Sequence, residues 1–230
     1  MFCFKKEDIQ RALDIVKCIN IPEKFGPYED SDSVDLDGLE DDLYNYIGED
    51  FHLDSGISKL VIIVKDLPFV IKIPFNGMWY AEDHYDEEED EYWTDYYFDY
   101  YDTNYCDREY ELTRAIEDAG FEMFVPRMAR LCEVNGVTIY IQEKVIPSNE
   151  MKSGFTPSED SLKKAKEYHL TFNYEWMAAA LETYGEDVWA RFVIWGDTPH
   201  INLFDDMHSG NYGIDMAGRP VIFDVSGFDR

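Results

Sequence analysis

Three oxygen-bearing side chains near the C-terminal end of the chain have a spacing suited to holding Mg²⁺ against phosphate. Asp206 and Asn211 are five residues apart, and Asp224 follows beyond a segment with a turn signal at Gly218. Four residues between Asp206 and Asn211 let both side chains point into one cleft, and a short hairpin would return Asp224 to it. Because Mg²⁺ takes hard oxygen ligands and keeps part of its water, one Asn and one Asp are sufficient protein ligands.

The same residues resemble the catalytic loop and the metal-binding motif of the protein-kinase-like superfamily. In that family an Asp is followed five residues later by an Asn, and a second Asp begins a DFG-type motif. Residues 206–211 (DMHSGN) are more similar to the small-molecule kinase branch, and residues 224–227 (DVSG) are one residue longer than the family form. The resemblance implies that Asp206 orients the attacking hydroxyl, that Asn211 and Asp224 bind Mg²⁺, and that ATP is the phosphate donor.

A strand lysine and a helix glutamate extend the resemblance toward the N-terminus. Lys72 lies in the sequence VIKI, which is similar to the V-A-I-K pattern whose lysine contacts the α- and β-phosphates. It interrupts an otherwise apolar strand, and burying an unpaired ammonium is costly. In the family this lysine pairs with a helix glutamate, and the helix predicted over residues 108–119 offers Glu109, with Glu111 as the alternative. Glu109 is preferred because apolar residues of that helix share an inward face with it.

The other nucleotide contacts that the resemblance implies involve the main chain. Residues 137–145 are similar to the strand and linker that contact adenine, with main-chain groups of Glu143 and Val145 as the contacts and Gln142 just before them. Gly56 is the one glycine before the strand predicted over residues 58–64, where protein kinases have GxGxxG. We therefore expect backbone N–H groups here to bind phosphate more weakly than the glycine-rich loop of protein kinases does.

These matches occur in the family's order and imply an α+β, protein-kinase-like two-lobed fold. A β-rich N-terminal lobe is expected over residues 1–145, and a reduced helical C-terminal lobe with the catalytic-loop hairpin over residues 146–230. The chain ends soon after the second motif, so we do not expect the helices with which kinases hold a protein substrate. Small acidic chains of this kind look like products of phages or mobile elements.

Hydrophobic periodicity also predicts an α+β order of elements. The residue pair Asn135-Gly136 is the strongest short hairpin signal in the chain. Helices are predicted over residues 5–19, 108–119, 162–170 and 175–184, the last continuing to 195, with a short helix near 36–46. Strands are predicted over residues 58–64, 69–73, 128–133, 137–142, 212–214 and 221–223.

Residues 79–107 form an insertion that is almost wholly acidic and aromatic. They separate Lys72 from its expected helix, and neither a period of two nor a period of 3.6 is clean in them. Two interpretations are open. The insertion is either a solvated segment whose aromatic rings pack locally or an interaction surface for a basic protein partner.

Composition excludes several classes of partner. The chain has 20 Lys and Arg against 49 Asp and Glu, a formal net charge of -29. Such a chain repels the phosphates of nucleic acid and attracts basic partners. Its four cysteines form no CxxC pair, and no apolar run approaches the ~20 residues that span a bilayer. We expect a soluble, cytoplasmic protein with reduced thiols and no direct contact with nucleic acid or membrane.

Three functions are consistent with these features. The first is a minimal ATP-dependent phosphotransferase, since all five polar positions of a kinase site are present. The second is a pseudokinase-like interaction protein whose acidic surface binds or inhibits a basic partner. The third is a different α+β domain in which the motif is accidental.

Overall fold

The computed structural model describes residues 4–29, 36–86, 91–168, 170, 173–204 and 207–225. The chain is an α+β protein with mostly antiparallel sheets, as the sequence predicts. Contacts divide it into two compact units: unit 1 is Met1–Arg108 with Ala129–Gln142, and unit 2 is Glu109–Met128 with Glu143–Arg230. The single boundary expected after residue 145 stays a prediction. No helix in the described ranges is both long enough and apolar enough to cross a membrane.

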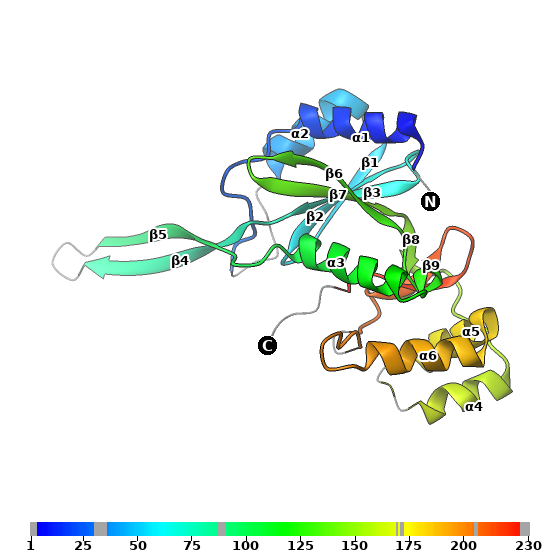
Figure 1. Cartoon of the computed structure of the whole chain (residues 1–230). Helices are drawn as coiled ribbons and strands as arrows, with labels where there is room; N and C mark the ends of the chain where they lie inside the picture. Colours follow the sequence, from blue (N-terminus) through cyan, green and yellow to red (C-terminus); the bar gives the residue numbers. More distant parts are fainter. Residues whose placement is uncertain are drawn as a thin grey trace. The chain divides into compact units, whose positions relative to one another are not determined.

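Unit 1 is built on a five-stranded sheet with two helices on one face (Figure 1). The strand order is β1-β2-β3-β7-β6, so two consecutive hairpins are joined to a third pair of strands made later in the chain. The elements are α1 (Lys6–Cys18), α2 (Asp37–Ile47), β1 (Phe51–Ser55), β2 (Lys59–Val64), β3 (Phe69–Pro74), β6 (Met128–Val134) and β7 (Val137–Glu143).

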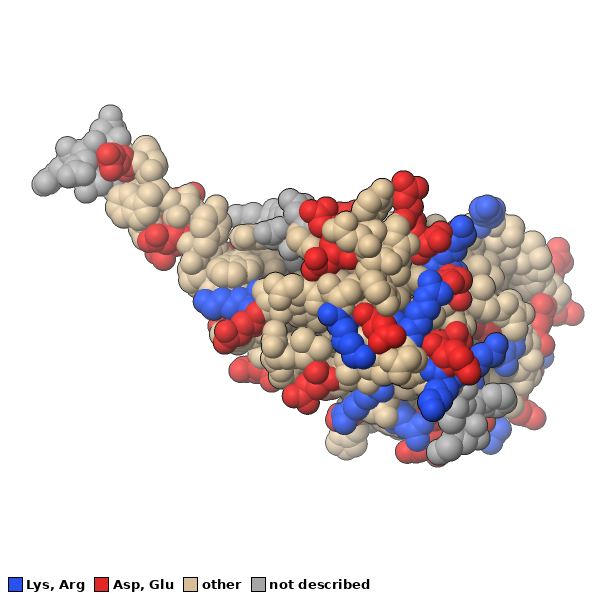
Figure 2. Space-filling model, turned by 90° about the horizontal axis from the view of Figure 1, so that it is seen from above, with Lys and Arg blue, Asp and Glu red and all other residues tan. Residues whose placement is uncertain are grey.

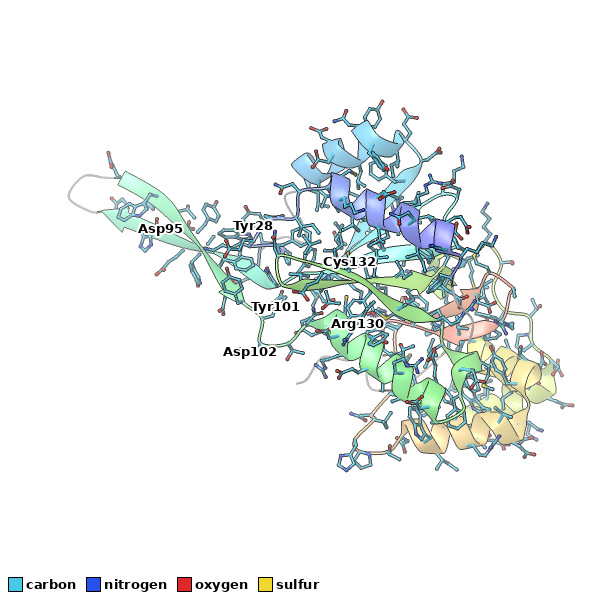
Figure 3. The ribbon with its side chains drawn as sticks, turned by 45° about the horizontal axis from the view of Figure 1, so that its top comes forward. Tyr28, Asp95, Tyr101, Asp102, Arg130 and Cys132 are labelled. Carbon is cyan, nitrogen blue, oxygen red and sulfur yellow. The ribbon has the colours of Figure 1, made fainter. Side chains whose placement is uncertain are left out.

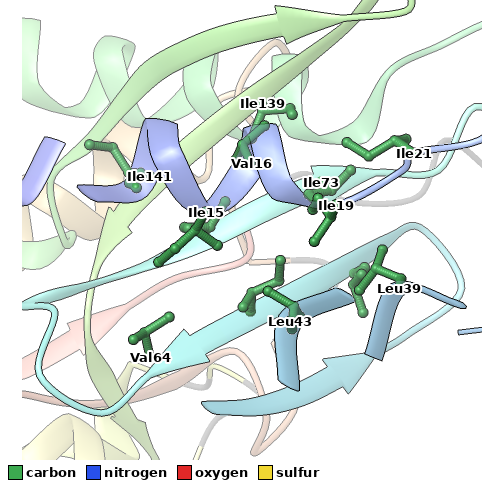
Figure 4. Close-up of a cluster of buried hydrophobic side chains, with 14 of the residues drawn as sticks. Ile15, Val16, Ile19, Ile21, Leu39, Leu43, Val64, Ile73, Ile139 and Ile141 are labelled. Atoms are coloured by element: carbon green, nitrogen blue, oxygen red, sulfur yellow. The ribbon is translucent and has the colours of Figure 1, made fainter. Parts of the chain in front are cut away.

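The core of unit 1 lies between these helices and the sheet (Figure 4). Successive side chains of a strand point to opposite faces, so every second residue of a strand faces the helices. On β3 these residues include Ile71 and Ile73, and the helices contribute Ile15 and Leu43, all of them fully buried. The other buried members are Leu60, Ile62, Val64, Phe69, Ile139 and Ile141, together with residues of the first helix and the segment after it.

The opposite face of the same sheet carries buried polar side chains. Lys72 and Gln142 are only 4% and 2% exposed, and both alternate with residues of the helix-facing core. Tyr140, which is fully buried on this face, donates its hydroxyl hydrogen to the carboxylate of Asp107. The strand lysine that was singled out in the sequence thus lies on the polar face of the sheet, away from the helix-facing core.

The acidic and aromatic insertion begins as a long antiparallel hairpin, which the sequence analysis did not predict. Its strands are β4 (Gly77–Asp86) and β5 (Glu91–Tyr100), paired over their whole length. The hairpin forms a two-stranded sheet of its own and projects away from the other strands of unit 1 (Figures 1 and 3). Isolated two-stranded hairpins are marginally stable in water, so its base needs anchoring.

The anchor at the base of the hairpin is the segment around Tyr28. The Glu29 N–H donates to the Trp79 carbonyl and the Trp79 N–H to the Pro27 carbonyl, both at 2.8 Å. The Tyr28 ring stacks on Trp79 with 6.2 Å between centroids. The backbones approach closely here, since a Cβ on Gly26 would lie 1.8 Å from the Gly77 carbonyl oxygen.

Unit 2 combines a small three-stranded sheet with helices. The sheet order is β10-β9-β8, and both pairs are antiparallel. Helix α3 (Tyr105–Asp118) starts in unit 1 and continues into unit 2. The other elements are η1 (Glu122–Phe124), β8 (Val145–Pro147), η2 (Ser148–Glu150), α4 (Glu159–Glu167), α5 (Tyr174–Tyr184), α6 (Glu186–Gly196), β9 (Tyr212–Asp215) and β10 (Pro220–Ile222).

The core of unit 2 is aromatic. Trp176 and Trp189 are fully buried with 5.8 Å between their ring centroids, and Phe124 stacks on Phe192 at 4.1 Å. The Trp176 Nε1–H donates to the carbonyl of Gly213 at 2.9 Å, which ties α5 to the central strand of the sheet. The aromatic core therefore fixes the strand that follows Asn211.

Most predicted elements are present, and three further differences add to the unpredicted β4–β5 hairpin. Residues 186–195 are helical as expected, but Gly185 adopts a φ of +87° and separates them, as α6, from α5. Strands β1 and β8 were not predicted. β1 is half-exposed and β8 has only three residues, so neither leaves a strong hydrophobic pattern.

Candidate nucleotide site

Two of the predicted site residues lie at the open end of the β9–β10 hairpin in unit 2. The register pairs Tyr212 with Ile222, and the Phe223 N–H donates to the Asn211 carbonyl at 2.8 Å. Asn211 therefore stands just before one strand and Asp224 just after the other. Asn211 is buried, with 3% of its surface exposed, while Asp224 is half-buried.

Glu109 joins this hairpin from a helix that precedes it by about a hundred residues in the chain. Its carboxylate Oε1 accepts the backbone N–H of Asp224 at 3.1 Å. Glu109 is fully buried and shares its helix face with Thr113 and Ile116, whereas Glu111, the alternative considered from the sequence, is exposed. A carboxylate that accepts a backbone N–H makes a charge-assisted hydrogen bond, which is stronger than a neutral one.

The backbone of Asp224 adopts the left-handed conformation, with φ +55°. This region is uncommon for residues other than glycine, although Asp and Asn enter it more readily than most. Residues held there cost about 1–3 kcal/mol and concentrate at functional sites. The hydrogen bond from Asp224 to Glu109 supports this conformation from the side of the helix.

The loop before Asn211 is closed by His208. The Asn211 N–H donates to the His208 carbonyl at 2.9 Å, and the Gly210 N–H donates to the His208 Nδ1 at 3.1 Å. These bonds make a tight turn that leads directly into β9. The turn fixes the main chain of Asn211, the proposed amide ligand.

Tyr184 anchors the other strand of the site hairpin. Its hydroxyl lies 2.7 Å from the Pro220 carbonyl and 2.9 Å from the Met123 carbonyl, both of which can accept its hydrogen. Burial raises the pKa of Tyr184 to about 12. Burial likewise raises the pKa of Tyr101, in unit 1, to about 12.

These tyrosines predict a loss of stability in alkaline solution. An unfolded tyrosine loses its proton near pH ~10, whereas the folded Tyr184 keeps it until about pH 12. The unfolded state therefore binds fewer protons between these values, and the free energy of unfolding falls as pH rises through them. In Tyr184→Phe this fall should be shallower, because the contribution of Tyr184 is removed while that of Tyr101 remains. Urea unfolding at a series of pH values measures the slope, and equal slopes in both proteins would contradict the assignment.

The remaining part of the predicted site falls partly outside the described residues. Asp206 lies there, as do Ser226 and Gly227 of the second motif. Within the described ranges, no group of three or more His, Cys, Asp or Glu side chains is placed to hold a metal ion. The predicted Asn211 and Asp224 pair is smaller than such a group and suits Mg²⁺, which keeps several waters and borrows oxygens from phosphate.

Two predicted nucleotide contacts belong to unit 1. Lys72 is buried on β3, the third strand of its sheet. Gly56 lies in the turn between β1 and β2, where its N–H donates to the Lys59 carbonyl at 3.2 Å. The glycine is exposed, and a Cβ there would meet no described atom within 4 Å.

The two residues of the predicted adenine linker are already engaged in unit 2. The Glu143 N–H donates to the Arg127 carbonyl at 2.9 Å, and the Glu143 carboxylate accepts from the Arg127 N–H at 3.0 Å. Val145 is the first residue of β8 and pairs with Asp215. Because the Glu143 N–H is used within the protein, an adenine contact at this residue would go through its carbonyl oxygen.

The bond between Glu109 and Asp224 was not predicted from the sequence. The resemblance implies a pair of Glu109 with Lys72 and no link from the helix to the second motif. No local signal could have shown it, because the two residues are far apart in the chain. Comparisons with protein-family models, with curated proteins and with solved structures give no match to this chain.

Proposed function

We propose that this chain binds ATP with Mg²⁺ at a protein-kinase-like site and acts as a minimal phosphotransferase. The observation that carries the proposal is the convergence of Glu109, Asn211 and Asp224 in unit 2. The backbone of Asp224 is held by the Glu109 carboxylate, and that of its neighbour Phe223 by the Asn211 carbonyl. Glu109 is thus hydrogen-bonded to Asp224, and Asn211 is bonded to the residue directly before Asp224.

The fold supports the finer assignment to a two-lobed kinase-like architecture. Unit 1 supplies an antiparallel sheet whose third strand carries a buried lysine, and unit 2 supplies helices and the hairpin that leads to Asp224. In the proposed site Asn211 and Asp224 bind Mg²⁺ through oxygen atoms. Lys72 contacts the phosphates and Asp206 orients the acceptor hydroxyl, roles that rest on the resemblance. When bound, Mg²⁺ would neutralise charge on the transferring phosphate.

A thermal-shift experiment tests nucleotide binding. A ligand at about 100 times its Kd stabilises the folded state by about 2.7 kcal/mol, so MgATP should raise the melting temperature clearly. Asp224→Asn should lose this increase, because it removes a metal-binding oxygen and the charge. Asparagine tolerates the left-handed backbone, so the variant should still fold.

Asp118→Asn is the matched control, since it removes one exposed carboxylate from the same unit. It should keep the full response to MgATP. If wild type shows no increase with MgATP, or if both variants lose it equally, the nucleotide site is excluded.

Turnover needs a separate measurement. We expect wild type to transfer or release the labelled γ-phosphate of ATP, and Asp206→Asn to lose about 10²-fold or more of that rate, as a missing catalytic acid or base does. A protein that binds MgATP but shows no difference between wild type and Asp206→Asn would be a pseudokinase-like binder. That result would end the phosphotransferase proposal and leave the nucleotide site intact.

A further inference from the structure

The two faces of the β4–β5 hairpin differ in charge. Directly opposite residues of an antiparallel pair share a face, so the register assigns every described side chain of the two strands. We call one the Trp79 face and the other the Trp93 face. The Trp79 face holds Trp79, Ala81, Asp83, Tyr85, Tyr92, Thr94, Tyr96, Phe98 and Tyr100, and the Trp93 face holds Met78, Tyr80, Glu82, His84, Glu91, Trp93, Asp95, Tyr97 and Asp99.

The Trp79 face has partners within the protein for its base and for its described carboxylate. Its base is covered by Tyr28, which contacts Trp79 and Tyr96. The single carboxylate among its described side chains, Asp83, accepts the hydroxyl hydrogen of Thr94 at 2.7 Å. This face therefore has an internal partner for its described carboxylate and for the rings at its base, while Tyr92 and Tyr96 remain 77% and 60% exposed.

The Trp93 face is arranged as a ladder in which an acidic pair lies between two aromatic pairs. Tyr80 stacks on Tyr97 with centroids 5.3 Å apart, and His84 stacks on Trp93 at 5.1 Å. Between these stacks Glu82 stands directly opposite Asp95. Tyr97 and Trp93 remain about half exposed, at 52% and 47%.

The acidic pair formed by Glu82 and Asp95 lowers the stability of the folded hairpin. Like charges placed directly opposite each other destabilise a two-stranded sheet. Asp95 lies 3.2 Å from the His84 Nε2, but Glu82 has no hydrogen-bond or ion-pair partner among the described residues. No Lys or Arg occurs anywhere in residues 77–100. A cation that neutralised this exposed pair would come from elsewhere in the chain or from another molecule. On the face that Figure 2 shows, the projecting strands carry acidic and uncharged residues, and Lys or Arg atoms appear only beside their base.

From this geometry we infer that the Trp93 face of the hairpin binds an arginine side chain of a basic, extended protein segment. The guanidinium would lie over Glu82 and Asp95, with the rings of Tyr97 and Trp93 on either side. Rungs on one face are about 7 Å apart, so a cation at the acidic rung lies close to the ~6 Å range of cation–π attraction from both rings. This inference does not depend on the nucleotide site.

Arginine fits this face better than lysine does. Its planar guanidinium can donate to two carboxylates in one plane and stack on an aromatic ring at the same time. A lysine ammonium can lie over a ring, as Lys24 does over Trp79, but it is a compact, strongly hydrated charge without the planar fork that matches two carboxylates. Nucleic acid is disfavoured by the acidic charge of the chain, and a second copy of the chain would be repelled for the same reason.

The binding experiment uses the full chain and three synthetic peptides without added nucleotide. The peptides share one glycine- and serine-rich sequence with three variable positions, filled with arginine, lysine or neutral citrulline. Calorimetry at physiological salt is chosen because charges more than about 8 Å apart are then largely screened. We expect the arginine peptide to bind about tenfold more tightly than the lysine peptide, and the citrulline peptide not to bind.

Matched variants separate the proposed face from bulk charge. Glu82→Gln/Asp95→Asn should weaken the arginine peptide by about tenfold or more, as expected for the loss of both charge partners. Glu40→Gln/Asp41→Asn, on the exposed side of α2, removes the same charge and should leave the affinity unchanged. For the rings, Tyr97→Leu should weaken binding and Tyr92→Leu, on the Trp79 face, should not.

Four results would overturn the inference. They are no binding of the arginine peptide by wild type, equal affinity for arginine and lysine, equal losses in the two double variants, or a wild-type dimer that Glu82→Gln/Asp95→Asn converts to a monomer. The last would make the face a contact between copies. Near-ultraviolet circular dichroism of each variant checks that the stacked rings of the hairpin are still formed.

Discussion

Replacing Gly213 with alanine is expected to disrupt the sheet of unit 2. Gly213 lies in the central strand β9, opposite Pro147 of β8 and Val221 of β10. A Cβ at this position would lie 2.0 Å from the Ile146 carbonyl oxygen and 3.0 Å from the Pro147 Cα. Both are backbone atoms, so no side chain can rotate away, and β8 must separate from β9.

The loss of folding free energy is not limited to the strand, because the Gly213 carbonyl also accepts the Nε1–H of the buried Trp176. Overpacking a core typically costs about 1–3 kcal/mol, and loss of a buried hydrogen bond adds about 1–3 kcal/mol when a polar group is left unsatisfied. We expect Gly213→Ala to lower the free energy of unfolding of unit 2 by about 3 kcal/mol or more.

Hydrogen exchange of the β8 and β9 amides, together with urea unfolding, measures this effect. Gly154→Ala is the control, since a Cβ there would meet only the Glu175 carboxylate at the ordinary contact distance of 3.7 Å. It should change stability by no more than about 0.5 kcal/mol. Equal protection of β8 and β9 in the two variants would show that the sheet can accept a side chain at Gly213.

Replacing Ile73 with alanine is expected to destabilise unit 1 by a similar amount. Ile73 is fully buried on β3, opposite Leu60 of β2, and faces the helices in the unit 1 core (Figure 4). Removing a buried isoleucine side chain down to alanine costs about 2–5 kcal/mol, because the cavity that remains adds to the lost burial. The strand it holds also carries Lys72, so its loosening reaches the proposed phosphate contact.

Comparing alanine and valine at position 73 tests this prediction more closely than one substitution does. Ile73→Val should cost only about 0.5–1.5 kcal/mol, because a single methylene is lost. Urea unfolding of wild type and the two variants gives the three free energies. If alanine and valine at this position are equally stable, Ile73 is not packed as described.

The sequence predicted the sheet of unit 1 better than it predicted the hairpin, for a physical reason. On β2 and β3 one face is buried, so apolar residues such as Ile62 and Ile71 recur at every second position and reveal the strand. On the β4–β5 hairpin neither face is buried in a core. Aromatic residues stand on both faces, as Tyr85 and Trp93 do, and the period of two disappears.

The sequence predicted only those parts of the candidate site that depend on local patterns. The spacing of Asn211 and Asp224 is local, and β9 and β10 are present where short strands were predicted. The hydrogen bond between Glu109 and Asp224 is set by tertiary packing, which no local pattern reports. The residues that close the turn at His208 act mainly through backbone groups, and these leave little trace in side-chain identity.

The order of strands in unit 1 has a consequence for how the chain emerges during synthesis. β3 ends at Pro74, but its neighbour β7 begins only at Val137, after the hairpin and α3 have been made. At about 5–20 residues per second, β3 waits for several seconds as an open, apolar edge that could pair with other nascent chains. The first segment to follow it is the hairpin, which carries no Lys or Arg and many carboxylates. Its negative charge would keep neighbouring chains apart until β7 closes that edge.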